Sequence, residues 1–393
     1  MTSRALATLI ALQFGPSIIT ENSVIFITES LVTENYDMEN PFKYGTIVAE
    51  PYFTDRREEF KTILNFLNSP NHLILISPRR FGKTSLIKKV LSNLNRRYIY
   101  INVQKAVSTA DLASLLIKEA IKGHPLEKIK TYLRNFRIIP TISMNPITNG
   151  IDISFSATGD GNVLLEDAFD LLESIGLSDN RLIVVLDEFQ EILSLEKGID
   201  KRLRSFMQEQ SHVNYIFLGS QESMMTEIFE KVKSPFYHFG QLMYLKKIPY
   251  EDFFTYIVQG LKAVALNAEA IAKEILQITQ CHPYYTQQLS STVWDLLAYK
   301  KIAQDEPPVK TAIAQLIAIH DLDYERLWMS FSKTDRRILR DVAIGNPLSN
   351  PGYATSTNYT AANRLMKSGY LIKIDKYEIE DPFFQRWVLE TQN

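Results

Sequence analysis

Residues 73–91 read LILISPRRFGKTSLIKKVL. The four apolar residues at the start predict a short buried strand, and the apolar spacing after Lys83 predicts an amphipathic helix. Between them, SPRRFGKT follows the pattern G-x-x-x-x-G-K-[ST], with Ser77 in place of the first glycine. Because the motif lies between a strand and a helix, we interpret it as a phosphate-binding loop rather than a basic turn without a ligand.

The chemistry of such a loop gives each residue type a role. Backbone N–H groups and the helix N-terminus surround the phosphates, a lysine neutralises their charge, and a hydroxyl binds Mg²⁺. We therefore expect Lys83 to bind phosphate and support catalysis, and Thr84 to bind the metal. Ser77 adds a Cβ where the loop turns, which predicts either strain or a slightly reshaped loop. The predicted phosphate-binding residues are Ser77, Pro78, Arg79, Arg80, Phe81, Gly82, Lys83, Thr84 and Ser85.

The composition is that of an ordinary globular chain. Its 393 residues favour roughly two to three domains. A net charge of −2 gives no global basic field, so contact with nucleic acid would need a local patch. Cys281 is the only cysteine, which excludes an intrachain disulfide and fits a reducing, cytoplasmic location. No run approaches the ~18 apolar residues of a membrane span, so we expect no membrane contact.

Alternating strand and helix signals predict an α/β fold with a parallel sheet covered on both faces. Near-continuous apolar runs predict further strands at residues 98–103, 182–186 and 215–219. Between the first two of these, alternation around the turn Thr148-Asn149-Gly150 predicts a β-hairpin inserted into the core.

Changes of pattern divide the chain into four predicted regions. Residues 1–40 show no clear periodicity for most of their length and are expected to be a poorly ordered extension. Residues 41–249 contain the predicted nucleotide-binding α/β domain. In residues 250–322, apolar residues recur every three or four positions, which predicts a helical domain. Residues 323–393 have two helix patterns followed by two short strands, the order of a winged helix-turn-helix.

Two acids, Asp187 and Glu188, follow the buried strand predicted at residues 182–186. Open α/β sheets bind ligands at the carboxyl ends of their strands. Beside a phosphate loop, Asp187 would hold Mg²⁺ and Glu188 would activate the attacking water as the catalytic base. The alternative is that both acids only cap the helix that follows.

Ser220 and Gln221 follow the next predicted strand. Their side chains would reach the space between the terminal phosphate and the water held by Glu188, which is a sensor position. A polar pair after a strand is also ordinary turn chemistry.

An ordered series of motifs extends these inferences. It comprises FTDRREEF, LISPRRFGKTSL, LIVVLDEFQEI, FLGSQESMMTEIF, SPFYHFGQLMYLKKIP, TQCHPYYTQQL and a terminal DPFFQRW. From Pro41 to Trp387 the chain resembles the archaeal-type ATPases, a family of the AAA+ and STAND branch of P-loop NTPases that is similar in layout to origin-recognition ATPases. The resemblance implies that the helical domain is a lid over the nucleotide.

The resemblance also implies roles for particular residues. Arg56 would lie near the adenine, and Asp187 with Glu188 would be the Walker B pair. His282 and Pro283 match part of the motif by which the lid contacts the nucleotide, with Cys281 at its usual glycine. The alternative for His282 is a partly buried histidine at a helix start.

One departure from the family concerns the arginine that often follows its SP-x-Y segment. Residues 234–240 read SPFYHFG and contain no arginine. Because an arginine finger contributes about 10³ to 10⁵ in turnover, its absence predicts slow hydrolysis unless Arg202 or Arg204 substitutes.

The predicted winged helix offers a second possible role. Its recognition helix, residues 356–368, carries the polar residues Asn358, Tyr359, Asn363, Arg364 and Lys367, and the preceding helix carries Arg336, Arg337 and Arg340. Acids nearly balance bases across residues 323–393, which is unlike a typical duplex binder and leaves protein contact or lid packing as the alternative.

We therefore expect an ATP-binding protein with slow, Mg²⁺-dependent hydrolysis that acts as a conformational switch. One alternative is an ATP-gated protein whose winged helix binds DNA, and another is a degenerate scaffold, suggested by Ser77, Cys281 and His238. The sequence identifies ATP or ADP as ligands, but it does not identify a protein partner or an oligomeric state.

Overall fold

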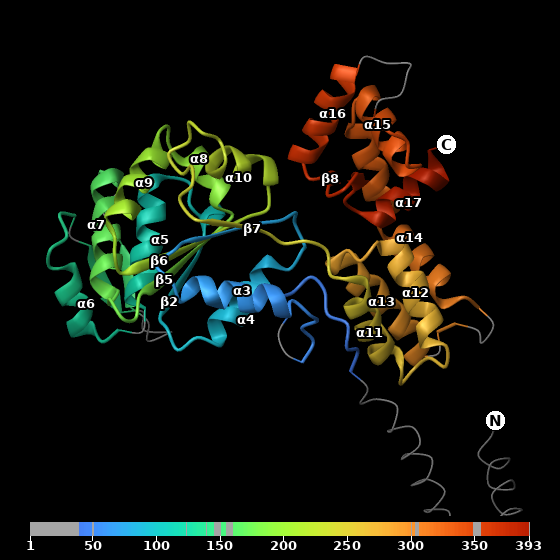
Figure 1. The fold of residues 1–393 in the computed structure, drawn as a ribbon, viewed down its shortest axis with the longest axis horizontal. Coiled ribbons are helices and arrows are strands. Elements are labelled where there is room, and N and C mark those ends of the chain that lie inside the picture. Colours follow the sequence, from blue (N-terminus) through green and yellow to red (C-terminus); the bar gives the residue numbers. More distant parts are fainter. Residues whose placement is uncertain are drawn as a thin grey trace, which may run out of the picture.

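Secondary structure gathers into two bodies, an α/β body and a C-terminal body made mainly of helices (Figure 1). The computed structural model describes residues 39–48, 51–122, 124–138, 140–144, 151–154, 160–299, 301–302, 306–348 and 355–392. Within these residues, no helix combines the length and apolar character that crossing a membrane requires.

The α/β body is built on a parallel five-stranded sheet in the order β2-β5-β6-β1-β7. Its strands are β1 (Leu73–Ile76), β2 (Tyr98–Asn102), β5 (Leu182–Asp187), β6 (Val213–Gly219) and β7 (Gln241–Tyr244). Four of them confirm the apolar runs recognised in the sequence. The analysis missed β7, a half-exposed edge strand that lacks the continuous apolar run of its neighbours.

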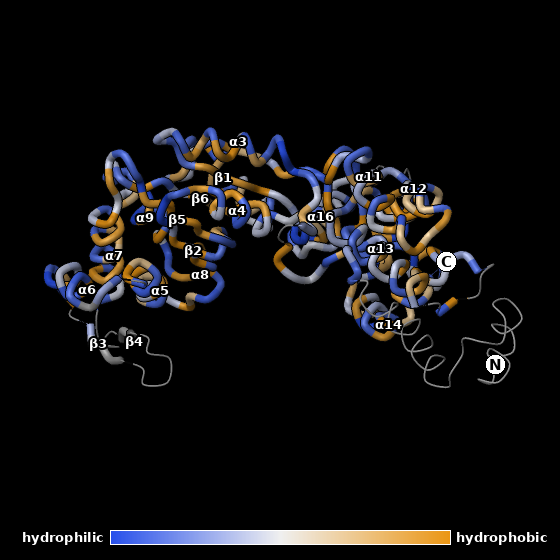
Figure 2. Tube along the Cα trace, turned by 90° about the horizontal axis from the view of Figure 1, so that it is seen from below, coloured by the Kyte–Doolittle hydropathy of each residue, from blue (hydrophilic) through white to orange (hydrophobic). Residues whose placement is uncertain are grey.

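Helices cover both faces of this sheet, as the prediction of an α/β fold requires. The helices of this body are α3 (Arg57–Leu67), α4 (Lys83–Ser92), α5 (Thr109–Ile121), α6 (Leu126–Leu133), α7 (Gly161–Ile175), α8 (Ile192–Leu195), α9 (Ile199–Glu209) and α10 (Glu222–Phe229). Figure 2 shows α3 on one side of the sheet and α5 and α7 on the other.

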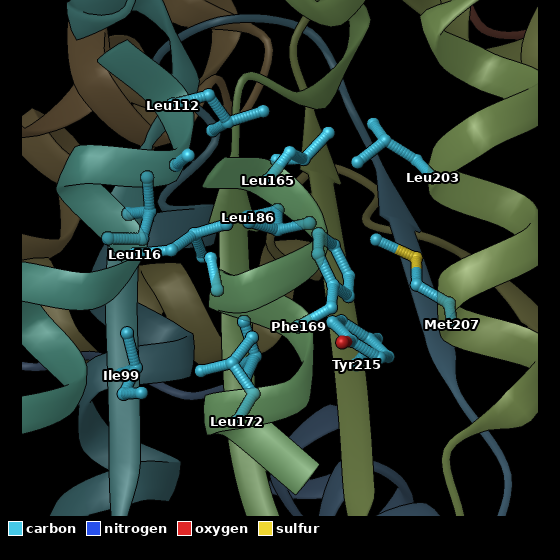
Figure 3. Packing of buried hydrophobic residues seen from close by; sticks show 14 of the residues in the cluster. Ile99, Leu112, Leu116, Leu165, Phe169, Leu172, Leu186, Leu203, Met207 and Tyr215 are labelled. Carbon is cyan, nitrogen blue, oxygen red and sulfur yellow. The ribbon is translucent and has the colours of Figure 1, made fainter. Parts of the chain in front are cut away.

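Successive strand residues enter different hydrophobic clusters because side chains alternate across a sheet. Val184 and Phe217 pack with residues of α5, α7 and α9, whereas Val185 and Leu218 pack with residues of α3 and α4. Figure 3 shows the first cluster, where Leu116, Phe169 and Met207 converge over the strands. Each strand of the centre is therefore buried on both faces.

The predicted hairpin forms a separate two-stranded antiparallel sheet. Its strands are β3 (Thr141–Met144) and β4 (Ile151–Ser154), with Met144 opposite Ile151. The predicted turn at residues 148–150 lies outside the described residues. Figure 2 shows β3 and β4 beyond α5 and α6. The hairpin is therefore inserted in the α/β body but is separate from its five-stranded sheet.

The C-terminal body consists of helices and one antiparallel pair of strands. The elements are α11 (Tyr250–Leu261), α12 (Ala268–Thr279), α13 (Pro283–Ala298), α14 (Pro308–Ser330), α15 (Lys333–Ala343), α16 (Thr355–Lys367), β8 (Leu371–Lys373), β9 (Tyr377–Ile379) and α17 (Pro382–Thr391). The order from α15 to β9 is that of a winged helix, as predicted.

One hydrophobic cluster runs through the whole C-terminal body. It includes Phe253 of α11, Trp328 of α14 and Trp387 of α17, all of them buried. Helix α14 continues through residues 322 and 323, where the analysis divided a helical domain from a winged helix. The division of the chain at residues 40, 249 and 322 stays a prediction.

We expect Phe217→Ala to destabilise the α/β body strongly. Phe217 is fully buried, and its ring lies 4.6 Å from that of Phe189 and 5.2 Å from that of Phe229. Truncation leaves a cavity that costs about 3–5 kcal/mol, measurable as an earlier urea transition of this body. Leu177→Ala is the control, since Leu177 is 58% exposed. Equal shifts for the two variants would contradict this view of the core.

Candidate functional site

The carboxyl ends of three neighbouring strands meet at one edge of the sheet. Because β6 lies between β5 and β1, the residues that follow these strands are brought side by side. Register places Ile76 opposite Gly219 and Leu186 opposite Phe217. The phosphate loop after β1, the acids after β5 and Ser220 after β6 therefore converge, as the sequence predicted.

The loop after β1 leads directly into helix α4, which begins at Lys83. Gly82 precedes the helix in the left-handed region with φ 87°, and Arg80 is left-handed with φ 63°. A helix N-terminus attracts anions through its dipole and its backbone N–H groups. Ser77 is not among the left-handed residues, so its Cβ meets no strain of that kind, and a reshaped loop at this position stays a prediction.

Ser77 instead supplies acceptors to Lys83. The Lys83 ammonium donates to the Ser77 carbonyl at 2.9 Å, to Ser77 Oγ at 3.2 Å and to the Pro78 carbonyl at 3.0 Å. Burial lowers the pKa of Lys83 to about 8 because the charged form loses water. The ammonium thus lies inside the loop, and the three oxygens that accept its hydrogen bonds are all uncharged.

Asp187 lies at the end of β5 beside the start of α4. Thr84 Oγ1 is 3.4 Å from Asp187 Oδ2, and the Tyr100 hydroxyl donates to the same oxygen. Burial raises the pKa of Asp187 above its usual range. The two residues predicted to bind metal are therefore adjacent, and their carboxylate is buried among hydroxyl groups. Sequence analysis missed Tyr100, whose only signal was its place near the end of the neighbouring strand.

Glu188 is held by two side chains. Its Oε2 accepts a hydrogen bond from Ser220 Oγ at 2.6 Å and from Gln190 Nε2 at 2.6 Å. The predicted base and the predicted sensor serine are thus in direct contact. Gln190, which is fully buried, was not recognised in the sequence, although it lies within the quoted motif LIVVLDEFQEI.

Two cavities open at this edge of the sheet. The larger, of about 740 Å³, lies between the phosphate loop, residues 43–48 and the start of α13. Predicted site residues that line it are Arg56, Arg79, Arg80, Phe81, Gly82, Lys83, Thr84, Ser85, Glu188 and Pro283. The smaller, of about 540 Å³, lies between the loop, the start of α10 and the winged helix, and its lining includes Pro78, Arg79, Ser220 and Gln221.

Two residues that were expected to contact the nucleotide, His282 and Arg56, also contact Phe81 of the loop. His282 precedes α13 with 2% of its surface exposed, packs edge-on against Phe81 and does not line the larger cavity. Arg56 lines that cavity, but its guanidinium also donates to Glu59 at 2.8 Å and to the Phe81 carbonyl at 3.3 Å. His282 therefore supports the loop from outside the cavity, whereas Arg56 both contacts the loop and faces the cavity, so its role near the adenine stays a prediction.

Residues with left-handed backbones gather around this site. Arg56, Arg80, Glu188 and Cys281 all have positive φ, between 53° and 70°. Such a conformation costs about 1–3 kcal/mol for a residue other than glycine and persists where the surrounding structure imposes it. Cys281 is the residue at which the resemblance implied a glycine, and its positive φ is a backbone conformation that favours glycine.

The two arginines considered as substitutes for a finger are engaged on α9. Arg202 pairs with Glu196 at 2.7 Å, and Arg204 lies 4.2 Å from the centre of the Phe239 ring. Neither lines the two cavities described above.

The winged helix uses much of its polar surface internally. Asn358 is buried and binds Arg337 and the Leu348 carbonyl, so the prediction that α16 offers it on a polar face was wrong. Arg364 pairs with Asp335, and Arg336 donates to the Trp328 carbonyl. The polar positions predicted on α16 include Tyr359, which is 43% exposed.

Comparison with known proteins identifies relatives of this arrangement. The sequence model of a family described as an ATPase domain predominantly from Archaea matches residues 53–289. No curated protein matches the chain. The Walker-type ATPase of Pyrococcus abyssi has a similar structure, with a TM-score of 0.62 at 18% identity over 88% of this chain and 99% of that one. The ORC2 protein of Aeropyrum pernix, solved as ADPNP–ADP complexes, gives 0.51 at 14% identity over 91% and 98%.

We expect the affinity for a phosphate ligand to fall as the pH rises above about 8. The charged form of Lys83 attracts an anion, and its pKa of about 8 means that the free protein loses this charge between pH 7 and 9. Affinity for a non-hydrolysable ATP analogue should drop about tenfold over that interval, measured by calorimetry. Lys83→Arg, whose guanidinium stays charged, should remove the dependence. A constant wild-type affinity would contradict the assignment.

Proposed function

The chain belongs to the family of ATPase domains found predominantly in Archaea, and from that premise we propose that it binds ATP at the larger cavity and hydrolyses it slowly. The observation that carries this proposal is the convergence of Lys83, Thr84, Asp187 and Glu188 at one edge of the sheet. Helix α4 directs its positive end to the same point. Phosphate, metal and water sites are thus supplied together.

The phosphates would lie on the loop. Lys83 would exchange its neutral acceptors at Ser77 and Pro78 for phosphate oxygens, which repay the burial of its charge. The backbone N–H groups after Gly82 would bind the same oxygens.

Mg²⁺ fits beside Thr84 and Asp187. A hydroxyl and a buried carboxylate 3.4 Å apart are ligands that this cation prefers, and the pKa of Asp187 is raised because burial removes water from its charged form. When bound, the metal neutralises charge on the phosphates. Tyr100 would orient Asp187 through their hydrogen bond.

Glu188 would act as the base. It accepts a proton from a water molecule whose oxygen bonds to the γ-phosphorus as the bond to the β–γ bridging oxygen breaks, yielding ADP and phosphate. Ser220 and Gln190 already occupy Glu188 Oε2, and residues 234–240 supply no arginine. Both features favour slow turnover. Ser220 and Gln221 would sense the terminal phosphate from the strand next to Glu188.

Nucleotide binding would also act on the relative placement of the two bodies. The larger cavity is lined from the α/β body by the loop and from the C-terminal body by Pro283, Tyr284 and Gln287. A ligand that contacts both sides favours the arrangement in which both contacts form. We therefore propose a nucleotide-driven switch in which the helical domain closes and the winged helix moves with it.

We expect Glu188→Gln to keep nucleotide affinity and to lower hydrolysis by at least about a hundredfold, because the amide cannot accept the proton. Lys83→Ala should abolish binding. Phosphate release and calorimetry on the purified proteins measure both effects.

Glu227→Gln is the matched control for Glu188→Gln, since Glu227 is an exposed acid of α10 that pairs with Lys231 at 3.1 Å and lines neither cavity. Its turnover should equal that of the wild type. Unchanged hydrolysis in Glu188→Gln would remove Glu188 as the base, and absence of Mg-ATP affinity in the wild type would establish the degenerate scaffold instead.

Binding of duplex DNA through the winged helix stays the alternative. The burial of Asn358 and the pairing of Arg364 with Asp335 do not favour it, because the first removes a polar group from α16 and the second offsets the charge of an exposed arginine. We expect no ATP-dependent retention of a labelled duplex at physiological salt. Retention that requires ATP and weakens with salt would support the alternative, since phosphate contacts release counterions.

A further inference from the structure

Arg80 connects the phosphate loop to the C-terminal body. Its guanidinium donates to the hydroxyl of Tyr285, lies 3.5 Å from Glu380 Oε2 and lies 4.9 Å from the ring centre of Tyr284. The two tyrosines come from α13, and Glu380 follows β9 of the winged helix. One loop residue thus contacts both the helical part and the winged part of that body.

Glu380 depends on this contact for its charge. Its side chain is 10% exposed, and Oε2 accepts a hydrogen bond from the Tyr285 hydroxyl at 2.7 Å. Its other oxygen, Oε1, lies 3.7 Å from His282 Nε2, and within the described part of the chain neither atom has a hydrogen bond. Burial raises the pKa of Glu380 to about 7. The hydrogen bond from Tyr285 and then the charge of Arg80 act against this rise in pKa, so the buried carboxylate is stabilised by both partners and loss of either is costly.

Arg80 also lines the larger cavity, together with Gly82 and Lys83. Its side chain is 48% exposed, so it can exchange partners without leaving a packed core. A phosphate bound on the loop would be a second anion within reach of the same cation. Because Arg80 has one guanidinium group, hydrogen bonds from it to a bound phosphate weaken its pairing with the Glu380 carboxylate, and the reverse also holds.

We propose that Glu380 and Tyr285 are positioning residues that hold Arg80 off the phosphate site, so that a nucleotide phosphate and the C-terminal body compete for one guanidinium. The proposal rests on the proposed binding of nucleotide at the loop. By thermodynamic linkage, a contact that weakens nucleotide binding is itself weakened by nucleotide to the same degree.

If phosphate takes Arg80, the winged helix loses its contact with that arginine but keeps its other contacts with the α/β body. A second contact, between Lys247 and Glu378, joins the end of the α/β body to β9 and does not involve the loop. Ile372 of β8 also belongs to the cluster that includes Leu245, at the end of the α/β body. These contacts keep the bodies attached when Arg80 turns to the phosphate.

Variants of the two acceptors test the competition. We expect both Glu380→Gln and Tyr285→Phe to tighten binding of a fluorescent, non-hydrolysable ATP analogue by at least about fivefold, because each frees Arg80. Tyr285→Phe changes no charge, so its effect cannot come from the electric field of a lost carboxylate. In an Arg80→Ala background, neither substitution should alter the affinity.

Arg79→Ala provides the matched background. Arg79 is the neighbouring exposed loop arginine and lines the same cavity. In Arg79→Ala, the substitutions at Glu380 and Tyr285 should tighten binding as they do in the wild type. If Glu380→Gln still tightens binding of the analogue in the Arg80→Ala background, the effect comes from the lost carboxylate charge itself, and the proposal is overturned.

A second measurement follows the winged helix itself. Hydrogen exchange of the backbone around residues 377–380 should rise when the analogue binds wild-type protein and should not change in Arg80→Ala. Weaker or unchanged binding in Tyr285→Phe would overturn the competition while leaving the ATP site intact. Absence of binding in the wild type would instead overturn the proposed function.

Discussion

The parallel register of β5, β6 and β1 is the constraint on which the candidate site depends. Parallel strands present their carboxyl ends at one edge, and the order of these three places Ser220 between the acids and the phosphate loop. No side chain needs to reach across the molecule, because the sheet has already gathered the groups. The apolar runs that bury both faces of the sheet thereby fix the geometry of its chemistry.

At that edge, charges are buried with partners that only partly compensate them. Lys83 is bound by carbonyl and hydroxyl oxygens, whereas Asp187 is bound by the hydroxyls of Tyr100 and Thr84. Each charge would gain from the opposite charge of a magnesium nucleotide. The strained backbones of Arg80 and Glu188 occur at the same place. Electrostatic and conformational costs are thus concentrated where a ligand could offset them.

The contact between the two bodies extends this logic beyond the sheet. Arg80 belongs to the loop by sequence and to the surface of the C-terminal body by its contacts with Tyr285 and Glu380. Under the proposed competition, this shared residue would couple phosphate occupancy to the placement of the winged helix. One hydrophobic cluster joins α11 to α17 and includes Ile379 of β9, so the winged part and the helical part share a core.

Sequence alone determined the order of elements, the phosphate loop and the acids after β5, because these depend on local patterns of apolar and polar residues. It could not reveal that Gln190 and Tyr100 hold the two acids, that Asn358 is buried, or that Ser77 carries no backbone strain. Those facts depend on φ angles and on side chains from separate strands. Above all, the pairing of Arg80 with Glu380 joins residues three hundred positions apart. Only the tertiary structure could decide it, since nothing in the local sequence of either residue specifies the other.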